Sequence, residues 1–190
     1  MSLTPFVPPG LISRVLAAED PKSIVGVDIS QGMVDQYNKI VFDHGIPPEE
    51  MRAVCVPPHE RLQGMTFDVI VVSDPNRDFG MDGSPTPSRT QCASAYHHFA
   101  SIDEVTTMLV STYLNPGGSL LVADLVHGGS THEIFPENSR HIVAHKGGFT
   151  EEDIRSTFEK AGLKNITFEI TARVRHAGHS VDLFLARGDK

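Results

Sequence analysis

One segment in the middle of the chain constrains the fold most, because it reads as strand, helix, turn and strand. Residues 67–71 form a nearly continuous apolar run, which is typical of a strand buried on both faces of a parallel sheet. Ser101 stands three residues before Glu104, and this capping box predicts the start of an amphipathic helix. Residues 115–118 (Asn-Pro-Gly-Gly) end that helix, and residues 119–124 form a second apolar run that closes on an acid. The segment therefore predicts a right-handed strand-helix-strand crossover.

The same alternation recurs towards the N-terminus. Residues 23–28 form a short apolar run that ends in an acid, Asp28, and Ser30 is placed to cap the helix that follows. Residues 51–56 are a candidate for the next strand. The repeated strand-helix pattern predicts an open α/β sheet with mostly parallel strands.

The C-terminal part has a different pattern. Thr150 and Asp153 predict the start of a helix that ends near Gly162. Residues 165–171 and 181–186 alternate enough to predict two closing strands. We expect them to form an antiparallel pair at the edge of the sheet.

Composition agrees with a single domain over residues 1–190, because 39% hydrophobic and 21% charged residues are ordinary values for a chain that buries a core. The net charge of -8 argues against a nucleic-acid or anionic membrane surface. No apolar stretch of about 18 residues and no signal-peptide pattern is present. With only two cysteines, Cys55 and Cys92, we expect a reducing, cytoplasmic setting.

Four segments in the expected order carry a family resemblance: residues 26–34, 67–71, 95–99 and 114–118. Together they resemble the class I S-adenosylmethionine-dependent methyltransferases, in particular the small-molecule type common in fungi. The resemblance implies a Rossmann-like fold, S-adenosyl-L-methionine as cofactor and a small-molecule acceptor. It implies that Asp28 holds the two ribose hydroxyls, a task that suits a carboxylate because it accepts two hydrogen bonds at once.

The resemblance also implies a set of site residues. The predicted cofactor-binding residues are Gly10, Asp28, Ile29, Met33 and Ala95. His97 and His98 are candidates for the catalytic base, one of them packing or capping and the other facing the site where a substrate proton is taken. We predict no metal site, since the other histidines lack a companion set of cysteines or acids at ligand spacing.

Plainer interpretations stand beside these. Asp28 near a helix start is favourable without any ligand, and a strand-end acid also serves the ribose in NAD(P)-dependent oxidoreductases. Such an oxidoreductase normally adds a Tyr-Lys or His catalytic pair, which the sequence does not show. A catalytically inactive scaffold or interaction protein is the third hypothesis. Gly117 and Gly118 are interpreted as turn residues that support the fold.

Two segments depart from the family pattern. Residues 1–9 contain three prolines and no glycine, so we expect that the first strand and most of the glycine-rich cofactor loop are missing ahead of Gly10. Residues 72–91 interrupt a motif that would otherwise run from Val71 into Cys92, and their composition predicts an unstructured insert. A retained in-frame intron and a genuine lid loop are both open interpretations of that insert. The sequence identifies neither the acceptor, nor the adenine-binding residue, nor the oligomeric state.

Overall fold

The structure is a computed structural model that describes residues 16–28, 30–56, 62, 64–72, 96–128, 143–176 and 179–190. Gly10, Ile29, Ala95, residues 1–9 and all but the first residue of the predicted insert lie outside the described residues. The predictions made for them therefore stay predictions. The chain divides into two compact units, residues 1–63 with 75–78 and residues 64–74 with 79–190, and each is described by itself.

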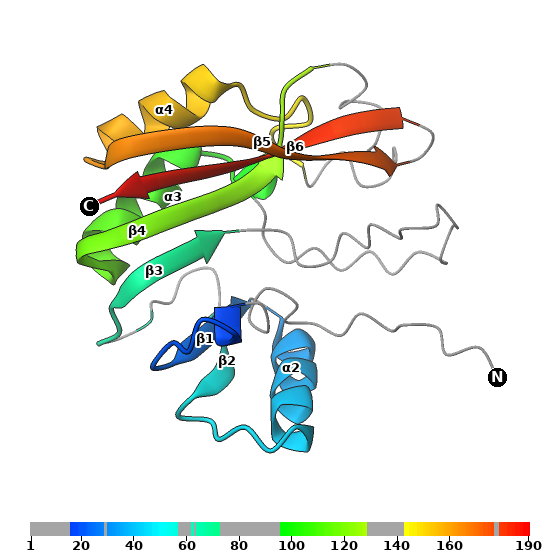
Figure 1. The fold of residues 1–190 in the computed structure, drawn as a ribbon, viewed down its shortest axis with the longest axis vertical. Coiled ribbons are helices and arrows are strands. Elements are labelled where there is room, and N and C mark those ends of the chain that lie inside the picture. The colour runs from blue at the N-terminus through cyan, green and yellow to red at the C-terminus, as the bar shows by residue number, and fades with distance from the viewer. Residues whose placement is uncertain are drawn as a thin grey trace. The chain divides into compact units, whose positions relative to one another are not determined.

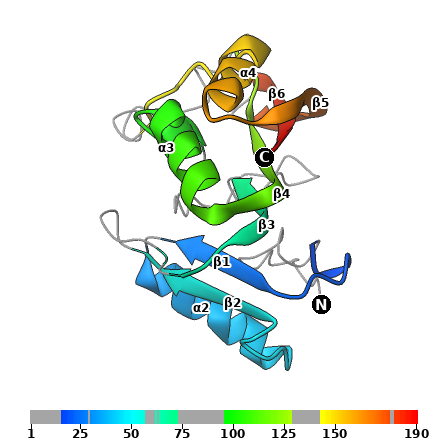
Figure 2. The same ribbon diagram turned by 90° about the vertical axis from the view of Figure 1, so that its left-hand side faces the viewer.

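The first unit is a strand-helix-strand element. β1 (Ile24–Asp28) and β2 (Met51–Cys55) pair in parallel from Ile24 opposite Met51 to Asp28 opposite Cys55, and α2 (Gln31–Asp43) connects them. Figure 2 shows α2 lying along the two strands. Its apolar face buries a small cluster with β2: Val34, Tyr37, Val41, Met51 and Ala53. Ser30 is the N-cap as predicted, although its side chain makes no capping hydrogen bond.

The second unit contains a four-stranded sheet in the order β3-β4-β6-β5. Its elements are β3 (Phe67–Val72), η1 (Tyr96–His98), α3 (Ile102–Met108), η2 (Leu109–Tyr113), β4 (Leu114–Leu125), α4 (Glu151–Lys160), β5 (Lys164–His176) and β6 (His179–Asp189). β3 is parallel to β4, while β6 is antiparallel to both β4 and β5. The predicted antiparallel edge pair is confirmed, and both of its strands are longer than the sequence indicated (Figure 1).

Both sheets contain the parallel pairing that is typical of doubly wound α/β folds. β1 pairs in parallel with β2, and β3 pairs in parallel with β4. In the described part of the chain, β1 and β3 each stand at the end of their sheet. The described strands thus agree with the prediction of an open α/β fold that has parallel strands and an antiparallel edge pair, whereas the missing first strand stays a prediction because residues 1–9 lie outside the described residues.

Helices α3 and α4 cover one face of the four-stranded sheet (Figures 1 and 2). Their apolar sides pack on the strands in one cluster, whose fully buried members include Leu120, Val122, Ile154, Phe158 and Phe184. Both predicted caps are confirmed. The Ser101 hydroxyl accepts from Glu104 N at 3.3 Å, and Thr150 and Asp153 form a complete capping box.

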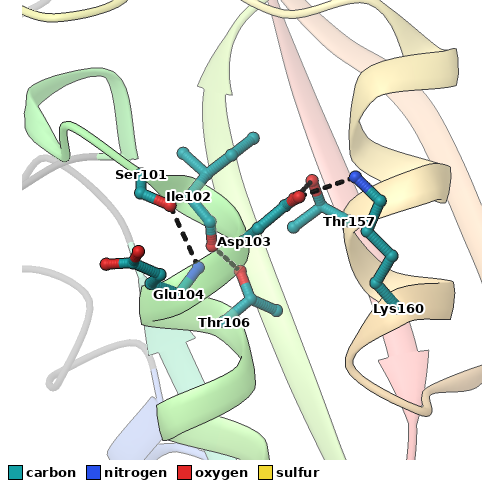
Figure 3. Close-up of polar contacts among 7 residues, drawn as sticks. All are labelled: Ser101, Ile102, Asp103, Glu104, Thr106, Thr157 and Lys160. Carbon is teal, nitrogen blue, oxygen red and sulfur yellow. Dashed lines mark hydrogen bonds and ion pairs between the residues drawn. The ribbon is translucent and has the colours of Figure 1, made fainter.

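A polar network joins the two helices beside this core (Figure 3). The Asp103 carboxylate on α3 accepts hydrogen bonds from Thr157 Oγ1 and Lys160 Nζ on α4, each at 2.6 Å. The hydrogen bond from Lys160, and then that from Thr157, holds the pKa of Asp103 below its usual value. The network ties α3 to α4 on their exposed side.

The Pro-Gly-Gly turn differs from its prediction, because it lies within β4 instead of before it. β3 pairs with β4 at Phe67 opposite Leu114 and again at Val69 opposite Ser119, so residues 115–118 bulge out between the two pairings. Lys190 N donates to Gly118 O and Gly117 N donates to Lys190 O, which extends the ladder with the chain's last residue. Pairing with a residue so far along the chain leaves no signal in the local sequence pattern.

Gly118 is required by close packing, and this gives a prediction. A Cβ at this position would stand 2.6 Å from the backbone oxygen of Asp68, which cannot yield without moving β3. We expect Gly118→Ala to lower the free energy of unfolding by about 1–3 kcal/mol, the usual cost of overpacking. The matched control is Gly32→Ala, where the nearest atom is 3.9 Å away. Urea denaturation followed by circular dichroism compares the two, and equal stabilities would contradict the packing argument.

Candidate functional site

The first predicted site residue, Asp28, lies at the carboxyl end of β1, where ligands bind in open α/β sheets. Its Oδ1 accepts a hydrogen bond from Ser30 N at 2.8 Å, and its backbone oxygen accepts from Val56 N at 2.9 Å. Among the described residues, Oδ2 has no hydrogen-bond donor. Asp28 therefore shapes the approach to α2, as the plainer interpretation held, and retains a carboxylate oxygen that can accept from a ligand hydroxyl.

Met33 lies in the first turn of α2, five residues after Asp28, and is partly buried. Its backbone N–H donates to Ser30 O at 3.1 Å. The structure thus places Asp28 and Met33 in the same unit, at the junction of β1 and α2. These are the two predicted cofactor residues that the structure describes.

The two histidine candidates lie on η1 in the second unit, and the structure separates them. His97 is 2% exposed, and its Nδ1 stands 2.8 Å from Oδ1 of the Asp124 carboxylate at the end of β4. The His97 backbone N–H donates to Oδ2 of the same carboxylate at 3.0 Å. Leu125 N donates to Oδ1 at 2.7 Å. His97 is therefore anchored in the interior.

His98 is less buried than His97, and its ring lies 4.2 Å from the His97 ring, centroid to centroid. A third histidine joins this group, since His145 N donates to His97 O at 3.0 Å. The His145 ring packs 5.0 Å from the ring of Phe149. Three chain segments thus meet at the carboxyl end of β4. Although His98 is the less buried of the two candidates, its Nε2 is itself buried, so its role as a base stays a prediction.

Tyr96, which the sequence did not single out, is excluded as a base by its surroundings. Its hydroxyl forms a hydrogen bond with Thr106 Oγ1 in the core, and the side chain is fully buried. Burial raises the pKa of Tyr96 to about 12, against the opposing hydrogen bond from Thr106. The hydroxyl therefore stays protonated at neutral pH and serves packing.

Two further features concern the described part of the chain. It holds no group of three or more His, Cys, Asp or Glu side chains placed to bind a metal ion. None of its helices is both long enough and apolar enough to cross a membrane.

Comparison with known proteins identifies relatives of this chain. No protein-family model matches the chain. An uncharacterized methyltransferase of Schizosaccharomyces pombe is 36% identical over 159 residues, which are 82% of this chain and 50% of that protein. The chain thus spans half the length of this curated relative.

Solved structures share the fold at low sequence identity. Phosphoethanolamine N-methyltransferase 2 of Haemonchus contortus, determined in complex with S-adenosyl-L-methionine, superposes with a TM-score of 0.63 at 16% identity, over 97% of this chain and 47% of that one. The YcgJ protein of Bacillus subtilis superposes with a TM-score of 0.62 at 11% identity, over 96% of this chain and 88% of that one. By its sequence the chain belongs to the methyltransferase family, and its fold is that of the class I S-adenosylmethionine-dependent methyltransferases.

Proposed function

We propose that the protein transfers the methyl group of S-adenosylmethionine to a small-molecule acceptor. The 36% identical relative is named a methyltransferase, and the H. contortus enzyme of the same fold was determined with S-adenosyl-L-methionine bound. Because the chain spans half of the yeast relative, the activity of the whole protein is part of this proposal. The comparisons give no support to the oxidoreductase or scaffold alternatives.

The position of Asp28 is the observation that supports this proposal most. Its carboxylate stands at the carboxyl end of a parallel strand with Oδ2 unpaired among the described residues. A ribose offers two neighbouring hydroxyl donors, and a carboxylate accepts both. The residues present therefore fit the sugar of a nucleoside cofactor, with Met33 beside it on the first turn of α2.

Methyl transfer from a sulfonium requires little of the protein beyond the placement of the two reactants. When bound, S-adenosylmethionine supplies a methyl group on a positive sulfonium, which an acceptor attacks in line. Asp28 binds and orients the ribose, and proximity and orientation supply most of the rate. Where the acceptor must lose a proton, His98 stays the candidate base, because His97 is held on Asp124.

Replacing Asp28 tests the proposal. We expect Asp28→Ala to weaken S-adenosylmethionine binding by about 1–3 kcal/mol, because the ligand hydroxyls lose their charged acceptor. The matched control is Asp35→Ala, which removes an exposed carboxylate that, among the described residues, accepts from Gln31 on the same helix. Calorimetric or NMR titration measures both variants.

The same titration separates the three functional hypotheses. Binding of S-adenosylmethionine but not NAD(H) supports the proposal, whereas preference for NAD(H) supports an oxidoreductase. Binding of neither cofactor supports an inactive scaffold. An affinity for S-adenosylmethionine that is the same in Asp28→Ala and in the parent would remove Asp28 from the site.

A further inference from the structure

Asp124 is a buried carboxylate to which the proposed reaction assigns no role. Its side chain is 1% exposed, and it accepts three hydrogen bonds: from His97 N, from His97 Nδ1 and from Leu125 N. A carboxylate oxygen accepts, so the pairing with Oδ1 requires the tautomer that carries its hydrogen on His97 Nδ1. A carboxylate buried this deeply is tolerated only when its oxygens are fully paired, so the arrangement is a built feature of the fold.

The contacts hold His97 from several directions. Asp124 fixes both its backbone N–H and its ring, and His145 N donates to its backbone oxygen at 3.0 Å. One residue of η1 is thereby tied to the end of β4 and to the segment before α4. We call the three hydrogen bonds to the Asp124 carboxylate the η1 latch.

The η1 latch lies at an edge of the sheet where ligand binding is expected. β3 and β4 are parallel, so their carboxyl ends lie on the edge of the sheet where α/β proteins bind ligands. η1 follows β3 in the chain and is held against the carboxyl end of β4 through the contacts of His97 with Asp124. A turn that borders a ligand site must be kept in place for the site to be preorganised.

We propose that Asp124 is a positioning residue for the cofactor: through His97 it fixes η1 in the conformation that S-adenosylmethionine binding requires. This inference rests on the proposed function. It assigns Asp124 no contact with the cofactor. Loss of the latch lowers affinity because part of the binding energy must then order η1.

Four variants of the full chain test the role. Asp124→Asn keeps the size of the side chain but turns an N–H group towards the latch donors. His97→Leu removes the ring donor, whereas His97→Asn keeps a donor at the position of Nδ1. Asp103→Asn is the matched control, because it breaks a carboxylate network of the same unit on the exposed side of α3 and α4.

We measure S-adenosylmethionine affinity by chemical-shift titration of the 15N-labelled chain, and His97 amide exchange in the free protein. We expect Asp124→Asn and His97→Leu to raise the dissociation constant about tenfold and to speed His97 exchange, and His97→Asn and Asp103→Asn to stay near the parent affinity. Should Asp124→Asn fail to fold, the His97→Leu and His97→Asn pair decides the question.

The outcomes distinguish a failure of the positioning role from a failure of the proposed function. Unchanged affinity in folded Asp124→Asn or His97→Leu overturns the positioning role and leaves the proposed function standing. An equal loss in Asp103→Asn also overturns it, because general destabilisation would then account for the effect. If the parent chain binds no S-adenosylmethionine while the His97 amide is protected from exchange, the proposed function fails and the positioning role fails with it.

Discussion

Adding a strand and a glycine-rich turn ahead of Gly10 is expected to tighten S-adenosylmethionine binding by roughly two to four powers of ten. The physical reason is the number of backbone donors. Residues 1–9 contain no glycine that could bring N–H groups close to the charged methionine end of the cofactor. Each hydrogen bond to a charged group that is not made forfeits about 1.5–3 kcal/mol, and we expect two to be absent.

The test compares the 190-residue chain with a variant that carries the added strand and turn and lacks residues 72–91. Deletion of residues 72–91 alone is one control, and the same extension with valine in place of its glycines is the other. Titration with S-adenosylmethionine and a methyl-transfer assay over a panel of acceptors give the readout. If the original chain binds as tightly as the extended one, its N-terminal segment supplies a cofactor site of a different kind.

The elements that sequence analysis predicted correctly are those decided by local chemistry. Apolar runs that end in an acid gave β1 and the second half of β4, and the capping residues Ser101 and Thr150 mark where α3 and α4 begin. In these places side-chain spacing and capping act within a few residues. They therefore leave a readable pattern.

The parts that were missed depend on pairing between distant residues. β4 begins at Leu114 because Phe67 pairs with it, and its glycines are held in the ladder by Lys190, far along the chain. The length of β5 likewise follows from β6, which pairs with it as far as His176. No window of a few residues contains this information.

The candidate site likewise has a part that the sequence predicted and a part that it did not. Asp28 could be placed at a strand end from its apolar neighbours, and the structure puts it there. The pairing of His97 with Asp124 joins residues 27 apart in sequence, so the two histidines looked equivalent until the fold was known. The available signal was that Asp124, like Asp28, is an acid that closes an apolar run. Such an acid is a candidate partner for any histidine in the loop after the neighbouring strand.

The largest loss of stability is expected from Phe158→Ala. Phe158 is fully buried on α4, and a Cβ on Gly188 would stand 2.8 Å from its Cδ2, so the ring lies directly against β6. Its neighbours in the core come from both strands and helices, so they have little freedom to move into the space that the ring vacates. Removing a buried phenylalanine side chain should cost about 3–5 kcal/mol. That is a large fraction of the roughly 5–15 kcal/mol by which a domain is stable.

Phe42→Ala is the matched control, because Phe42 on α2 is 80% exposed. Its substitution should change the free energy of unfolding by no more than about 0.5 kcal/mol. Urea denaturation monitored by circular dichroism gives both values, and hydrogen exchange of the β4 and β6 amides reports on the second unit separately. Comparable losses in the two variants, or a loss in Phe158→Ala confined to β1 and β2, would contradict the placement of this core between α4 and the sheet. The expected result is faster exchange throughout β4 and β6, because both strands bury their apolar side chains in the cluster to which Phe158 belongs.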